Sequence, residues 1–329
     1  MSLQEAGGGT PEAASRAAAP GDGALLTSFD MHRALVADVR ACPGAYVTNC
    51  HLMPADLRAA IEAGQMRLHQ DDPSCAVVLW DKGTHDQVFI HWADTGPDAE
   101  GGTGEEAPLP AALRFQRPSV IENPFAAATV EAPAEGAPAR LAQLARAWGF
   151  ETIRTSRRLE RALDAFDPLA HSPEAAGCRV GPAGPEDAGA VARMLAQGFD
   201  PRCDFIPDSD ELAQALAQQR ILCAWPDEAP QGQGEPAALL HFEEGAVTML
   251  RHLFVSEALR GRGVARALLA AYLVQARTRQ AHRAILWVRD DNAPALALYA
   301  SFGYRFEGRR SEEYFKEGAL GEDHVKEGS

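Results

Sequence analysis

The sequence predicts an α+β protein in which strands and helices are mixed around a sheet, arranged as two successive lobes. The chain has 329 residues, more than one compact domain commonly holds. Hydrophobic residues make up 46% of it and charged residues 23%, a balance that allows a buried core. Segments rich in turn-forming residues interrupt the apolar pattern at 95–110, 167–177 and 226–236. We place the boundary between the lobes at 167–177.

The first lobe is expected over residues 24–166, after a Gly- and Ala-rich tail at 1–23. Helical periodicity is present near 31–40 and 55–63, and CAVVLW and QVFIHW flank a DKGTH turn, which predicts a hairpin. The second lobe is expected over 178–316 and is followed by a tail at 317–329. It reads as a strand, two helices, three strands, a glycine-rich turn, a helix from 264 to 277, a strand, a short helix at 293–301 and a final strand pair beginning at Tyr304.

Charge and composition exclude several classes of partner. A net charge of −15 repels the phosphate backbone, so we expect no nucleic-acid partner. The chain contains no apolar run of about 18 residues, and its first residues lack the basic start and apolar core of a signal peptide. We expect a soluble, cytoplasmic protein with no membrane partner. The six cysteines and ten histidines show no CxxC, zinc-ligand or HExxH spacing, and we predict no metal.

A strand followed by a glycine-rich turn and a helix is the feature that carries chemistry. The turn reads Arg260-Gly261-Arg262-Gly263-Val264-Ala265, with Arg266 next. Glycines let the backbone N–H groups approach a ligand closely, and the helix N-terminus adds positive partial charge. The arginines add charged donors in an otherwise acidic chain. This combination favours a pyrophosphate site, although a tight strand-to-helix turn alone is the simpler alternative. The pattern is neither a nucleotide P-loop nor a dinucleotide-binding fingerprint.

The second lobe resembles the GNAT N-acetyltransferase superfamily. Arg260 to Ala265 matches its first signature, and Asn292, Ala295, Leu298-Tyr299 and Gly303-Tyr304 match its second. The resemblance covers residues 176–316 and implies the GNAT fold, a mixed, mostly antiparallel sheet flanked by helices. It also implies acetyl-CoA as cosubstrate.

The resemblance implies roles for particular residues. The backbone of Leu253, Phe254 and Val255 would pair with the pantetheine arm as an added strand does, while their side chains pack in a core. Asn292 would contact the pantetheine region, with a helix N-cap as the alternative. Tyr299 would be the general acid that protonates the departing thiolate, with a packed core tyrosine as the alternative.

The acceptor side is less defined by the sequence. Family members carry a base at positions matching Met249 or Arg251, and neither side chain accepts a proton at neutral pH. Strand alternation puts His252 on the other face. Arg251 would pair with an anionic part of the acceptor or form a surface ion pair. Asp204 in the loop 199–210, together with Asp208 and Asp210, would attract a cationic amine or lie solvated.

The end of the first lobe, LARAWGFETIRTSRRLER, echoes ALYASFGYRFEGRRSEEY in the second and lacks the preceding RxxGxG run. We interpret the first lobe as a degenerate GNAT-like unit that shapes the acceptor cleft, with an unrelated accessory domain as the alternative.

The leading hypothesis for the chain is acetyl transfer from acetyl-CoA to a primary amine of a small molecule or peptide N-terminus by direct attack in a ternary complex. A non-catalytic acyl-CoA-binding or sensing protein is the alternative.

Overall fold

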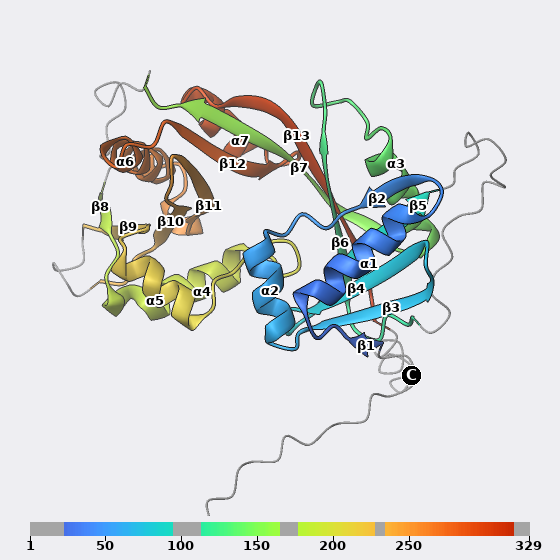
Figure 1. Cartoon of the computed structure of the whole chain (residues 1–329). Helices are drawn as coiled ribbons and strands as arrows, with labels where there is room; N and C mark the ends of the chain where they lie inside the picture. Colours follow the sequence, from blue (N-terminus) through green and yellow to red (C-terminus); the bar gives the residue numbers. More distant parts are fainter. Residues whose placement is uncertain (1–22, 95–112, 165–176, 228–233, 319–329) are drawn as a thin grey trace, which may run out of the picture.

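The computed structural model of the chain describes residues 23–94, 113–164, 177–227 and 234–318 (Figure 1). The predicted tails (1–23 and 317–329), the predicted linker (167–177) and the turn-rich segment 95–110 lie almost entirely outside these ranges. No helix within them is long and apolar enough to cross a lipid bilayer.

The first half contains the predicted helices and hairpin. Ser28 caps the first helix by accepting the N–H of Met31 at 3.1 Å, and Pro54 begins the second. The elements run β1 (Ala24–Leu25), α1 (Phe29–Ala41), β2 (Ala45–Thr48), α2 (Pro54–Glu62), β3 (Met66–Asp72), β4 (Cys75–Asp81), β5 (Asp86–Asp94), β6 (Ser119–Ala126), α3 (Ala137–Ala147) and β7 (Glu151–Ala162).

The second half follows the predicted order up to its last element. Its elements are β8 (Cys178–Pro182), η2 (Pro185–Asp187), α4 (Ala188–Gly198), α5 (Ser209–Ala217), β9 (Ile221–Pro226), β10 (Ala238–Glu243), β11 (Val247–Val255), η3 (Glu257–Leu259), α6 (Val264–Thr278), β12 (Arg283–Arg289), α7 (Ala293–Ser301) and β13 (Arg305–Lys316). The predicted strand pair after Tyr304 is wrong, because a single strand of 12 residues stands there. Its partners come from the first half.

All strands of the described residues belong to one sheet, in the order β1-β3-β4-β5-β6-β13-β7-β12-β11-β10-β9-β8, with β2 paired to β5. At the centre the halves exchange their last strands: β13 lies between β6 and β7, and β7 lies between β13 and β12. Figure 1 shows β7 and β13 running together through the middle of the molecule. Only β5–β6 and β11–β12 are parallel among the pairings of the described strands. The expected mixed, mostly antiparallel sheet is confirmed.

The registers of the two halves repeat each other. The first residues of β5 and β6 pair with each other, as do the first residues of β11 and β12. In turn, Ser119 of β6 pairs with the last residue of β13, and Arg283 of β12 pairs with the last residue of β7. Gly149 and Gly303, which precede the exchanged strands by two residues, both have positive φ, at 78° and 76°. The halves are therefore related by an approximate two-fold arrangement centred between β7 and β13.

The exchanged strands also complete the cores. Leu159 of β7 and Leu163 just after it belong to the apolar cluster of the second half, around α6 and β12. Tyr314 of β13 is fully buried in the cluster of the first half, against β4, β5 and α3. Neither half closes its own core without the other.

We predict that Tyr314→Ala lowers the free energy of unfolding by about 3–5 kcal/mol, because it removes a fully buried ring from a core that cannot collapse around the gap. Both halves should melt together at a lower temperature, as measured by scanning calorimetry. The control is Tyr314→Phe, which keeps the ring and removes only the hydroxyl that donates to Glu312, at a cost of about 1 kcal/mol. Separate transitions, one at the parent temperature, would contradict the shared core.

Candidate active site

The cleft of the second half begins where two parallel strands separate. β11 and β12 pair from Val247 and Arg283 to Leu250 and Leu286, and no described strand pairs with that edge of β11 beyond Leu250. On its other edge β11 remains paired to β10 as far as Val255. A cavity of about 1990 Å³ opens at the divergence. Backbone N–H and C=O groups of β11 at this edge need partners from a ligand or water.

The glycine-rich turn closes one end of this cavity. Gly261 and Gly263 have φ of 76° and 80°, which other residues rarely adopt, and a side chain at either position would meet open space. Gly263 is the N-cap of α6 and offers no side chain to the free N–H groups of the first helical turn. Gly261, Gly263, Val264 and Ala265 line the cavity. The turn is thus an open cradle of the kind that binds a pyrophosphate.

The arginines of the turn differ in position. Arg260 and Arg266 line the cavity, whereas Arg262 is exposed and does not. The Arg260 Nε donates to the carbonyl of Val255 at 3.3 Å, and the Arg266 Nη1 donates to the Ser301 Oγ at 2.8 Å. These bonds hold two of the three predicted cations beside the cradle.

Tyr299 and Asn292 lie along the same cavity, as do Leu253, Phe254 and Val255. Tyr299 is buried with its ring 5.7 Å from that of Tyr304, and burial raises its pKa, so the phenol stays protonated. The Asn292 Oδ1 accepts the N–H of Ala295 at 3.2 Å, which makes it the N-cap of α7. Asn292 therefore caps the helix and also lines the cavity.

The predicted acceptor residues are already engaged. The Arg251 Nε donates to Glu243 at 2.7 Å, and Asp204 accepts from the Arg154 Nη1 at 2.9 Å and from the Asp200 N–H at 2.9 Å. Both line the cavity. Of the other predicted loop acids, Asp208 caps α5 and Asp210 lies in its first turn, and neither lines the cavity. Asp208 therefore acts as a helix cap.

His252 also lines the cavity, although strand alternation separates it from Arg251. It is buried, and its Nδ1 lies 3.1 Å from the Nδ1 of His241. Burial lowers the pKa of His252 to about 4 and that of His241 to about 3. A base is most effective when its pKa lies near the working pH, so His252 is a weak candidate.

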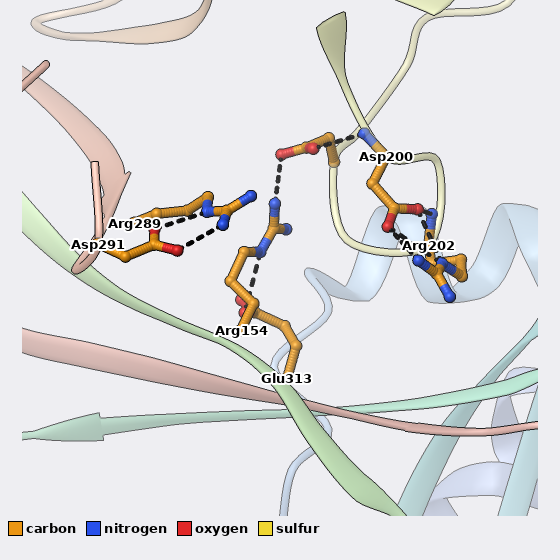
Figure 2. A network of polar contacts seen from close by, with 7 residues as sticks. Arg154, Asp200, Arg202, Arg289, Asp291 and Glu313 are labelled. Atoms are coloured by element: carbon orange, nitrogen blue, oxygen red, sulfur yellow. Dashed lines mark hydrogen bonds and ion pairs between the residues drawn. The ribbon is translucent and has the colours of Figure 1, made fainter. Parts of the chain in front are cut away.

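A charged cluster that lines the same cavity was not found from the sequence. Glu313 of β13 and Arg154 of β7 face each other, and the Arg154 Nε donates to the Glu313 Oε2 at 3.1 Å (Figure 2). Glu122 of β6 and His51 join them in lining the cavity. Burial raises the pKa of Glu313 to about 7, and Arg154 opposes this shift. These residues meet only because the last strands are exchanged.

Comparison with known proteins identifies the second half. The acetyltransferase (GNAT) family model matches residues 196–304, from the end of α4 to the start of β13. Residues 196–304 are a GNAT domain. No curated protein sequence matches the chain.

Solved structures extend the likeness to the whole fold. A tandem GNAT protein from the clavulanic acid biosynthesis pathway is 16% identical, with a TM-score of 0.53 over 90% of this chain and 98% of that one. A GCN5-related N-acetyltransferase from Sphaerobacter thermophilus is 18% identical, with a TM-score of 0.51 over 74% and 76% of the two chains. At such identities the likeness concerns the fold, which is that of two GNAT units in tandem.

The first half differs from the GNAT domain at the place of the cleft. β5 and β6 also diverge after two paired residues, but β2 fills the gap: Thr48 to Ala45 pair with His91 to Asp94 of β5. In the repeated register these β5 residues correspond to 252–255, the edge that faces the cavity in the GNAT domain. Counting back from Gly149 and Gly303, Ala145 stands where the GNAT domain has Tyr299. In the first half β2 therefore occupies the place of the cleft, and an alanine stands at the position that corresponds to Tyr299.

One group of possible metal ligands occurs among the described residues. His32, Cys50 and His91 bring their ligand atoms within 4.8 Å of one another. The two Nε2 atoms are 3.3 Å apart, and the His91 Nδ1 is 2.7 Å from the Tyr46 hydroxyl. Both nitrogens of His91 therefore have hydrogen-bond partners, and burial lowers the pKa of each histidine. The absence of a metal stays a prediction, which elemental analysis of the purified protein tests.

We predict that one acetyl-CoA binds per chain, because β2 hydrogen-bonds the strand edge that a second pantetheine arm would need. Calorimetric titration of the full chain measures the stoichiometry. A value of two would show that β2 leaves the edge of β5 and that the first half is not silent.

We also predict that Gly263→Glu weakens acetyl-CoA binding by about 100-fold or more, because it places a carboxylate in the cradle and opposes the helix N-terminus. Gly64→Glu is the matched control: Gly64 has φ of 69°, open space around it and no part in the cavity. Both variants carry the same backbone strain, so their melting temperatures should fall alike. Near-parent affinity in a folded Gly263→Glu protein would remove the cradle from the site.

Proposed function

We propose that this chain transfers an acetyl group from acetyl-CoA to a primary amine of a small molecule or a peptide N-terminus, by direct attack in a ternary complex. The observation that carries the proposal is the separation of β11 and β12 beside the glycine cradle, with Tyr299 lining the same cavity. The family match over residues 196–304 supports the same class of reaction.

In this proposal the pyrophosphate of acetyl-CoA lies on the turn of Gly261 and Gly263, with Arg260 and Arg266 as charged donors. Both arginines already border the cavity. The pantetheine arm runs along the free edge of Leu253, Phe254 and Val255 and forms main-chain hydrogen bonds there. Their apolar side chains remain in contact with the core of the GNAT domain: Leu253 and Val255 pack against one cluster and Phe254 against another.

The chemical step needs one proton removed and one supplied. The amine nitrogen attacks the thioester carbonyl carbon, the C–S bond breaks, and the thiolate takes a proton from the Tyr299 hydroxyl. Burial, which raises the pKa of Tyr299, keeps that proton in place until negative charge develops on sulfur. The cavity of about 1990 Å³ is large enough to hold both substrates at once, as direct attack requires.

Calorimetry with acetyl-CoA and a thiol-release assay across an amine panel test the proposal. The panel spans amino acids, polyamines, aminoglycosides and short peptides with free N-termini. Release of CoA that depends on one class of amine is the expected result. Tight acetyl-CoA binding without turnover of any amine would instead favour a non-catalytic sensor.

Tyr299→Phe is expected to lower kcat by roughly 100-fold while acetyl-CoA affinity stays near that of the parent, because the lost hydroxyl acts mainly in the transition state. Tyr304→Phe is the control, since its ring packs against Tyr299 but does not line the cavity. Steady-state kinetics and thermal melts compare the two variants. An unchanged kcat with a lowered melting temperature would make Tyr299 a structural tyrosine.

A further inference from the structure

The acceptor end of the cavity contains a row of charged side chains contributed by three adjacent strands. In the register of the sheet, Glu313 of β13 stands directly opposite Glu122 of β6 on one side and Arg154 of β7 on the other. All three line the cavity. This row is the place where strands from both halves meet at the site.

Negative charge exceeds positive charge within this row. Arg154 is bonded to two carboxylates, Glu313 at 3.1 Å and Asp204 at 2.9 Å, so one guanidinium serves two acids. Glu122 has the His51 Nε2 at 3.4 Å, and this contact raises the pKa of His51, so the histidine offsets part of the negative charge. Arg154 also acts on Glu122, but it is shared with the other two carboxylates. Cys203, which is close enough to influence Arg154, stays neutral because burial raises the pKa of its thiol.

Two of the nearby arginines are already paired with other acids, and a third, Arg309 of β13, also lines the cavity. Arg202 is bonded to Asp200 through two nitrogens, and Arg289 is bonded to Asp291 in the same way. Figure 2 shows these two ion pairs on either side of Arg154, and in each pair the arginine is bonded to an acid two residues away in the sequence. A positively charged ligand group would therefore lower the free energy of the row.

Glu313 is suited to exchange a proton near neutral pH. Its side chain is 8% exposed, and burial together with Glu122 raises its pKa, while Arg154 lowers it. The opposing influences leave the pKa at about 7, within the range that a general base needs. Glu122 itself has its pKa lowered by His51, so it stays ionised.

We propose that Glu122 and Glu313 bind the ammonium group of the acceptor and that Glu313 is the general base. This inference rests on the proposed acetyl transfer for the identity of the donor. One N–H proton passes to a Glu313 carboxylate oxygen, and the neutral nitrogen then attacks the thioester carbonyl. Glu313 passes that first proton to solvent. As the C–S bond breaks, Tyr299 protonates the thiolate, and a second proton leaves the attacking nitrogen for the Glu313 carboxylate and returns through solvent to the phenolate, which gives the neutral amide and CoA.

The same charge excess defines the class of acceptor. An α-amino acid carries a carboxylate beside its amine, and that group would face Glu122, Glu313 and Asp204, which are already in excess over Arg154. Repulsion between the ligand carboxylate and these acidic side chains would oppose binding. The site therefore selects a primary amine with no adjacent carboxylate, such as a diamine or an amino sugar.

Glu313→Gln tests the base, with Glu160→Gln as the matched control. Glu160 also lies on an exchanged strand and pairs with an arginine, Arg283 at 3.0 Å, but neither residue lines the cavity. We expect Glu313→Gln to lower kcat/KM for putrescine by about 100-fold or more and to abolish the rise in rate with pH through about 7. Glu160→Gln should match the parent in both.

Binding measurements separate this site from the donor site. Calorimetry with putrescine, glucosamine and alanine is run on the parent, Glu313→Gln and Glu122→Gln, alongside acetyl-CoA. The parent should bind putrescine and glucosamine better than alanine. Glu122→Gln should weaken amine binding and move the rise in rate to lower pH without abolishing it, because Glu122 raises the pKa of Glu313. Acetyl-CoA affinity should stay at the parent value in both variants.

Several results would overturn the inference: a Glu313→Gln protein with kcat/KM within about threefold of the parent and an unchanged pH profile, a preference for alanine, or no amine binding by the parent. Amine binding that is lost in Glu313→Gln, in a parent that transfers no acetyl group, would instead support the amine site and refute the proposed reaction. Thermal melts confirm that each variant is folded, and Glu313→Asp, which keeps a carboxylate, should recover the pH dependence.

Discussion

The exchange of β7 and β13 is the constraint on which the rest of the molecule depends. Each strand forms its backbone hydrogen bonds mainly with strands of the other half, and each carries apolar side chains into the other half's core. The sheet is consequently continuous through the centre of the molecule. The cleft, the cradle and the charged row are fixed relative to one another because they are all built on this sheet.

Local signals in the sequence were sufficient for the donor side of the site. Gly261 and Gly263 need positive φ, and Val264 begins a helix, so residues adjacent in the chain define the cradle without help from elsewhere. The short helix expected at 293–301 is present, and Asn292 caps it, as one of the two roles considered for this residue. Arg262 is the exception, since only the fold determines that its side chain lies outside the cavity.

The acceptor side could not be predicted, because it depends on which strands become neighbours. Glu122, Arg154 and Glu313 are far apart in the sequence, and each is an ordinary polar residue of a strand. The exchange also explains the incorrect strand pair after Tyr304: the alternation in this segment indicates a strand and contains no information about its partner. The filling of the first cleft by β2 was missed for the same reason.

The strand exchange also determines when the protein can finish folding. Ser119 pairs with Lys316, so β6 keeps an unpaired edge until almost the whole described chain has been synthesised. Pairings between residues so distant in sequence carry a large loop-closure entropy and form slowly. During synthesis the first half therefore exposes both a strand edge and the part of its core that awaits Tyr314, which makes this interval the one in which the chain is most exposed to aggregation.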